Sequence, residues 1–175
     1  MMVMRSHPRA ELYAAFGWFV LAAAAVLTTL THRNPGVLLA AGALAAFVVP
    51  ERDEPGWHGM LASSLIRIGD TAVFAAIAWA LASFQHDTAG AGRALAVLAL
   101  GLVSPYVRVR ARSLGLLAAS DEASFERGIR LVLVAAGFFT TGSSGVRVGL
   151  LVAATYSALR AFAWSVRIWR GASRV

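Results

Sequence analysis

Residues 60–84 read MLASSLIRIGDTAVFAAIAWALASF. Apart from Arg67 and Asp70, this stretch holds only apolar and small polar side chains. A helix needs about 20 such residues to cross the hydrocarbon core of a bilayer. The stretch is rich in Ala and shows no alternation of apolar and polar residues, so we expect a helix rather than a strand.

Similar apolar runs lie on both sides of this stretch and predict six spans in all, over residues 12–30, 35–49, 60–84, 91–107, 125–139 and 146–166. The composition agrees, because 58% of the 175 residues are hydrophobic and 14% are charged, with a mean hydropathy of +0.67. Soluble domains are about 45–50% apolar and about 25% charged. We therefore expect an all-α integral membrane protein with six transmembrane helices in a single domain over residues 1–175.

The residue types that are present and absent exclude several kinds of catalytic and metal-binding site. All sixteen basic residues are Arg, and the chain has neither Lys nor Cys. Disulfides, Cys-based metal sites, thiol nucleophiles, Schiff-base lysines and Walker-type lysines are therefore excluded. The net charge is +7, and the arginines lie mainly at the ends of apolar runs. This placement favours anionic lipid headgroups over nucleic acid as the partner.

Arginine placement also predicts the orientation. With six spans, one side of the membrane receives Arg5, Arg9, Arg52, Arg108, Arg110, Arg112, Arg127, Arg130, Arg160, Arg167, Arg170 and Arg174. The other side receives Arg33, Arg93 and Arg147. Cytoplasmic loops of membrane proteins carry the excess of Arg. We expect both termini in the cytoplasm and the protein in the cytoplasmic (plasma) membrane.

Arg67 and Asp70 lie within the third span, where a charge costs about 2.5–3.5 kcal/mol on insertion scales. They are three residues apart, so they share a helix face and can pair. This pattern fits a neutralised structural ion pair that faces the bundle. It also fits part of a polar functional site, and the two interpretations are compatible.

A second group of charges surrounds the connection between the fourth and fifth spans. Arg108 and Arg112 face one way and Arg110 faces roughly the opposite way, while Arg127 and Arg130 begin the next span. Pro105 predicts a kink at the end of the fourth span, and Ser120 is a candidate helix cap. Guanidinium groups match phosphate through paired hydrogen bonds, so the five arginines suit an anion clamp. The positive-inside rule alone also places arginine here.

Two segments resemble the CDP-alcohol phosphatidyltransferase family of six-helix membrane enzymes. They are PYVRVRARSLGL…FERGIRLVLV, within residues 105–134, and LASSLIRIGDTAVFAAIAWAL, residues 61–81. The resemblance implies transfer of a phosphatidyl group from a CDP-linked lipid to an alcohol, with release of CMP. It also implies a homodimer or a heterodimer with an active relative. The candidate phosphate- or lipid-binding residues are Arg67, Asp70, Tyr106, Arg108, Arg110, Arg127 and Arg130.

The sequence departs from the family pattern where the metal ions bind. The four metal-binding aspartates of the family fall on Ala41, Leu44, Ala62 and Ile66, and Pro105 and Arg112 replace a Ser and a Glu. Glu122 and Glu126 have the spacing of the last aspartate pair, but they begin the fifth span. We therefore expect a degenerate member with no metal, cofactor or catalytic residue. It would bind an anionic or CDP-linked lipid, or act as a partner subunit.

Two alternatives stay open. In the first, the protein is an active phosphatidyltransferase whose Mg²⁺ or Mn²⁺ is held by Asp70 with Glu51, Asp53 or Glu54. In the second, it is a small transporter or a structural membrane protein, with Arg67 and Asp70 lining a path.

Overall fold

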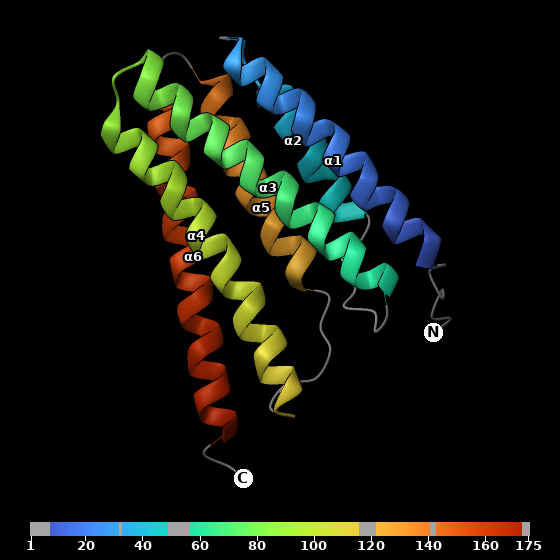
Figure 1. Ribbon diagram of the computed structural model, residues 1–175. Coiled ribbons are helices and arrows are strands. Elements are labelled where there is room, and N and C mark those ends of the chain that lie inside the picture. Colours follow the sequence, from blue (N-terminus) through green and yellow to red (C-terminus); the bar gives the residue numbers. More distant parts are fainter. Residues whose placement is uncertain (1–7, 32, 49–56, 116–121, 141–142, 173–175) are drawn as a thin grey trace.

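In the computed structural model, the described part of the chain forms six helices, shown in Figure 1. They are α1 (Pro8–Leu30), α2 (Gly36–Val48), α3 (Trp57–Phe84), α4 (Thr88–Ser113), α5 (Glu122–Phe139) and α6 (Ser143–Ala172). The structure describes residues 8–31, 33–48, 57–115, 122–140 and 143–172, and none of these residues forms a strand. The all-helical prediction is confirmed.

The helices form a closed ring around one apolar core. Consecutive helices pack as the pairs α1·α2, α3·α4 and α5·α6, and the contacts α1·α3, α2·α5 and α4·α6 join these pairs into the ring. The fully buried side chains at its centre include Leu39, Ile77, Leu131 and Leu150. Four different helices supply these four residues, so the core ties the ring together.

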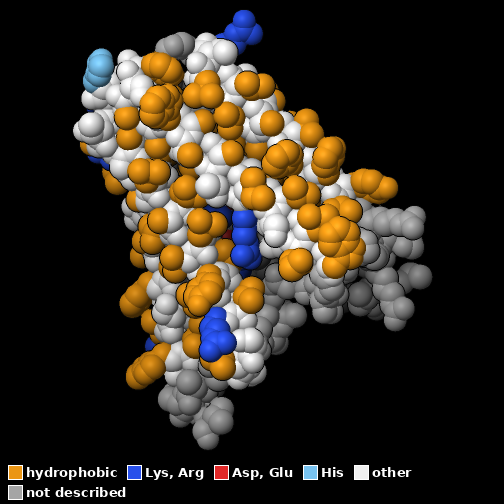
Figure 2. Space-filling view, in the orientation of Figure 1, with side chains coloured by type: hydrophobic (Ala, Val, Ile, Leu, Met, Phe, Trp, Pro, Cys, Tyr) orange, Lys and Arg blue, Asp and Glu red, His pale blue; other side chains and the backbone are white. Residues whose placement is uncertain are grey.

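Among the residues that the structure describes, four helices are long and apolar enough to cross a membrane: Leu12–Leu30, Gly59–Phe84, Thr88–Ala111 and Ser144–Arg170. A shorter apolar helix spans Gly36–Phe47. Large apolar side chains such as Tyr13, Leu44, Trp79 and Phe162 are more than half exposed. Figure 2 shows apolar side chains spread over one face of the molecule. An apolar surface of this extent suits a lipid environment.

The two ends of the ring differ in charge. The start of α1 and the end of α6 lie toward one end, and the turn between α3 and α4 lies at the other (Figure 1). We call the first the basic end, because the second half of α4, the start of α5 and the second half of α6 bring most of the described arginines there. The opposite end carries Arg33, Arg93 and Arg147.

Side chains and one unusual backbone conformation shape the turns at the opposite end. The Asn34 Oδ1 accepts a 2.8 Å hydrogen bond from the Gly36 N–H, while its Nδ2 donates to the Phe138 carbonyl at 2.8 Å. Asn34 thereby caps α2 and ties it to α5. His86 adopts a left-handed conformation (φ 52°), and the Asp87 N–H donates to the Leu81 carbonyl. The Asp87 Oδ1 then caps α4 by accepting from the Gly90 N–H at 2.9 Å.

Two helices extend well beyond the apolar runs that predicted them. α4 continues through Pro105 to Ser113, and α6 continues to Ala172. Charged side chains end an apolar run without ending a helix. Each extension therefore contains arginines that lie beyond the predicted span. Pro105 removes one N–H donor from the helix ladder, so the carbonyl of Gly101 loses its usual partner.

Candidate functional site

The charged residues of the basic end surround a cavity of about 30 Å³ between α3, α4 and α5. We call it the arginine cavity. Its charged lining residues are Arg67, Asp70, Arg108, Glu126, Arg127 and Arg130. Apolar residues such as Phe74, Val97 and Leu98 complete the walls. Figure 2 shows basic side chains between α3 and α4, within a largely apolar surface.

The first ion pair of the cavity joins α3 to α5. The Arg127 Nε donates to both oxygens of Asp70, at 3.1 and 3.2 Å, and the two side chains are 8% and 13% exposed. This differs from the pairing within α3 that the spacing of Arg67 and Asp70 permitted. Both residues line the same cavity, in agreement with the predicted shared helix face, but Asp70 is bonded to an arginine from a neighbouring helix. A spacing of three residues allows a contact without excluding a better partner from another helix.

The Trp18 ring packs against the arginine of this ion pair. The guanidinium carbon of Arg127 lies 4.4 Å from the centre of the Trp18 ring, a distance typical of a cation–π contact. The indole N–H donates to the Ile66 carbonyl at 3.3 Å. A Cβ at Gly42 or Gly69 would collide with the ring. The two glycines therefore make room for Trp18 between α2 and α3.

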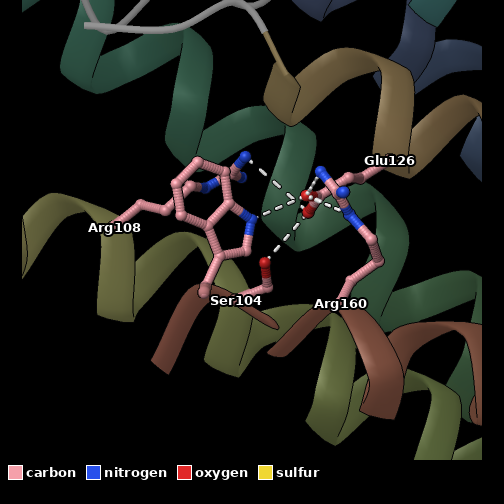
Figure 3. Close-up of polar contacts among 5 residues, drawn as sticks. Ser104, Arg108, Glu126 and Arg160 are labelled. Carbon is pink, nitrogen blue, oxygen red and sulfur yellow. Dashed lines mark hydrogen bonds and ion pairs between the residues drawn. The ribbon is translucent and has the colours of Figure 1, made fainter. Parts of the chain in front are cut away.

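The second group of polar contacts centres on Glu126, which is 5% exposed. Its carboxylate accepts hydrogen bonds from the Ser104 hydroxyl at 2.9 Å, the Arg160 Nε at 2.8 Å and the Trp164 indole N–H at 2.8 Å. We call these residues, with Arg108, the Glu126 cluster. Figure 3 shows them converging on the carboxylate from α4 and α6.

Arg108 completes the cluster. Its Nη1 lies 3.7 Å from the Glu126 Oε2, and its guanidinium carbon lies 5.4 Å from the centre of the Trp164 ring. Arg160 and Arg167 lie near the same ring, at 5.9 and 5.0 Å. One buried carboxylate and one indole ring thus hold three cationic side chains at the boundary of the arginine cavity.

The remaining arginines of the cavity lining are Arg67 and Arg130. The Arg130 guanidinium lies against Gly101, where a Cβ would collide with it. Among the described residues, no hydrogen bond or ion pair joins Arg67 to another side chain. The Nη2 of Arg127 is buried and has no hydrogen-bond acceptor within the described part of the chain. A buried donor of this kind calls for an acceptor, because leaving it unsatisfied costs about 1–3 kcal/mol.

The structure brings together five of the seven candidate residues, namely Arg67, Asp70, Arg108, Arg127 and Arg130. Tyr106 is 67% exposed, Arg110 is exposed, and neither lines the cavity. Both lie on α4 between positions that face the cavity, so their side chains point away from it. The side chain of Arg112, the proposed cap Ser120 and the acidic segment 51–54 lie outside the residues that the structure describes.

Sequence reasoning did not identify Glu126, Arg160, Trp164 or Trp18 as parts of the site. Glu126 carried one signal, since it is an acid next to Arg127 in the first half of a largely apolar helix. The other three come from helices far away in the sequence. The two tryptophans look like residues that face lipid, and the sequence assigned Arg160 to the basic side without indicating a partner for it.

The described residues contain no group of three or more His, Cys, Asp or Glu side chains that would hold a metal ion. The two carboxylates of the cavity, Asp70 and Glu126, are both bonded to arginine.

Comparison with protein-family models, curated proteins and solved structures found no match to this chain. The resemblance to CDP-alcohol phosphatidyltransferases therefore stays a prediction from sequence.

Proposed function

We propose that this protein binds the phosphate of an anionic lipid in the arginine cavity, and that it does not transfer phosphatidyl groups. The observation that carries the proposal is the charge of the lining. Four arginines and two carboxylates leave a formal charge of +2 in a partly apolar setting. Guanidinium groups bind phosphate more strongly than neutral donors do.

The proposed protein is a six-helix member of the CDP-alcohol phosphatidyltransferase type that has lost its metal site. Its arginine-rich end faces the cytoplasm, where anionic lipids are concentrated. It acts as a lipid-binding subunit, as a homodimer or beside an active relative. The apolar surface and the basic end support this placement, and the resemblance supports the choice of family.

Attack on a diphosphate requires cations that neutralise the developing charge. Asp70 is a weak candidate for holding such a cation, because it already neutralises Arg127. An active enzyme would need further ligands from the acidic segment 51–54. This alternative predicts that Asp70→Asn abolishes turnover.

The experiment that tests the proposal measures CMP release from CDP-diacylglycerol by detergent-purified protein. The reaction contains Mg²⁺ or Mn²⁺, then a chelator, with a panel of free and phosphorylated alcohols and an active transferase as control. We expect no release, together with saturable binding of anionic lipid that weakens in Arg127→Gln. Release that the chelator abolishes would overturn the proposal in favour of a rebuilt metal site.

A further inference from the structure

A second cavity, with a volume of about 340 Å³, lies at the end of the ring opposite the basic end. Small-molecule sites usually measure about 300–1,000 Å³, whereas protein interiors hold few voids larger than a water molecule. We infer that this cavity is a second ligand site, and that it takes a small, water-soluble monocarboxylate with an apolar body, bound through Arg33. This site is separate from the arginine cavity, and the inference does not depend on the proposed function.

The position of the cavity in the ring decides from which side a ligand enters. Its lining comes from the ends of α1, α3 and α5, from the start of α6 and from the turn that precedes α2. The buried lining residues Ile77, Leu81 and Val146 belong to the apolar core, whereas Arg33 and Gln85 are exposed. The cavity therefore extends from the core to the turns, and it opens along the bundle axis toward water rather than sideways toward lipid.

Hydrogen bonds within the protein fix the mouth of the cavity. Asn34 ties the turn before α2 to the end of α5. The Arg33 N–H donates to the Thr28 carbonyl at 2.8 Å. The hydroxyls of Thr29 and Thr140 donate to backbone carbonyls of the preceding helix turn, at 2.7 and 3.0 Å. A mouth that is already held in place loses little conformational freedom when a ligand binds.

The charge of the lining selects the class of ligand. Arg33 is the only charged residue among the described residues of the lining. Within the described part of the chain, its guanidinium group forms no ion pair or hydrogen bond. The acid at this end, Asp87, is already bonded to Arg147 and to the Gly90 N–H. Arg33 is therefore available for one anionic group, and a guanidinium group binds a carboxylate through two parallel hydrogen bonds.

The other lining groups favour a carboxylate over a phosphate. The two threonines and Asn34 already donate to backbone carbonyls, so Gln85 is the side chain that can add a further donor. A carboxylate has two oxygens to satisfy, and a phosphate group has more. The apolar walls are suited to an aryl or branched alkyl body, and they include Pro35, Ile77, Leu81, Phe138 and Val146.

The test is isothermal titration calorimetry of the purified protein in detergent, with empty micelles as the blank. Phenylacetate and isovalerate represent soluble monocarboxylates. Phenylacetamide has the same body as phenylacetate without the charge, phenylphosphate replaces the carboxylate with a phosphate, and octanoate represents a carboxylate that the lipid phase supplies. We expect saturable binding of phenylacetate and isovalerate, and about tenfold weaker binding of the other three probes.

Arg33→Gln is the matched variant, and Arg93→Gln is its control. Both remove one positive charge from the same end of the bundle, but only Arg33 is among the lining residues. Removal of a charged hydrogen-bond donor should weaken phenylacetate binding about tenfold in Arg33→Gln and leave it unchanged in Arg93→Gln. Because Arg33 is exposed, the variant should keep the melting temperature of the wild type.

A second variant fills the cavity without changing its charge. Ala80 is half-buried and lines the cavity, so Ala80→Phe should abolish phenylacetate binding. Phenylacetamide or phenylphosphate binding as tightly as phenylacetate would contradict the monocarboxylate. Octanoate binding without phenylacetate or isovalerate binding would contradict a soluble ligand. Equal phenylacetate affinity in Arg33→Gln and the wild type, or no saturable binding of either soluble probe to the folded wild type, would overturn the inference.

Discussion

At the basic end of the bundle the Arg127 side chain is 8% exposed and bonded to Asp70, whereas at the opposite end the Arg147 side chain is 45% exposed and bonded to Asp87. Both pairs join an arginine to an aspartate far away in the sequence, but Asp70 lies within α3 and Asp87 lies in the turn before α4. Asp87 already caps α4, and water also reaches its arginine. Asp70 has no such backbone role, and it compensates a guanidinium that the bundle buries.

The cavities at the two ends differ in the same way. The cavity at the opposite end is larger, about 340 Å³, but Arg33 is its only charged lining residue among those described. The polar side chains of Thr29, Asn34 and Thr140 there are bonded to nearby backbone groups. The arginine cavity holds six charged residues in a much smaller space. Concentrated and partly uncompensated charge, rather than volume, distinguishes the candidate site.

The largest expected effect comes from removing the carboxylate at the centre of the Glu126 cluster. Glu126→Ala removes the carboxylate that pairs with the buried Arg108 and accepts hydrogen bonds from the half-buried Arg160 and the buried Trp164. Breaking a buried ion pair from one side costs about 3–5 kcal/mol. Thermal unfolding in a mild detergent measures the loss, and Glu126→Gln, which keeps an acceptor oxygen, should lose less. Equal stability of the alanine variant and the wild type would show that the cluster does not hold α4 to α6.

A smaller loss is expected for Asp70→Asn, because one charged hydrogen-bonded pair is weakened, at about 1.5–3 kcal/mol. A double-mutant cycle tests which arginine is the partner. Asp70→Asn and Arg127→Gln should be coupled, whereas Asp70→Asn and Arg67→Gln should be additive. Coupling to Arg67 instead would restore the pairing within α3 that the sequence allowed.

At the opposite end, acid should weaken the α3–α4 turn. The Gly90 N–H and the nearby Arg147 hold the pKa of Asp87 below its ordinary value. A lowered folded-state pKa contributes stability that is present above the unfolded value of about 3.9 and is lost as the pH falls through the folded value. The melting temperature of the wild type should therefore decline more steeply below pH 4 than that of Asp87→Asn. Identical pH profiles would contradict the capping role.

The smallest effect belongs to the exposed face of α4. Arg110→Gln should change stability by no more than about 0.5 kcal/mol, because the side chain is exposed and lies outside the cavity. Lipid binding should also stay at the wild-type level. A large loss in either measurement would mean that the outer face of α4 takes part in the site.

Hydrophobic patterning was sufficient to predict the helices. Each predicted span corresponds to one helix, and the differences lie at the ends, as in the extension of α4 through Pro105 to Ser113. The alternation of buried Arg108 and exposed Arg110 followed from helical geometry. The partner of Asp70 could not be predicted, because three-residue spacing within α3 competes with contacts from helices far away in the sequence.

By itself, the sequence determined that this protein is an all-helical chain with an apolar surface and an excess of arginine at one end. Those properties follow from local hydrophobicity and charge, which each segment carries whatever its neighbours are. Only the tertiary structure decided that Glu126 joins α4 to α6, that Asp70 neutralises Arg127 rather than Arg67, and that Trp18 underlies that pair. These contacts connect residues as far apart in the sequence as Trp18 and Arg127. Their energy depends on burial, which exists only after the ring of helices has closed.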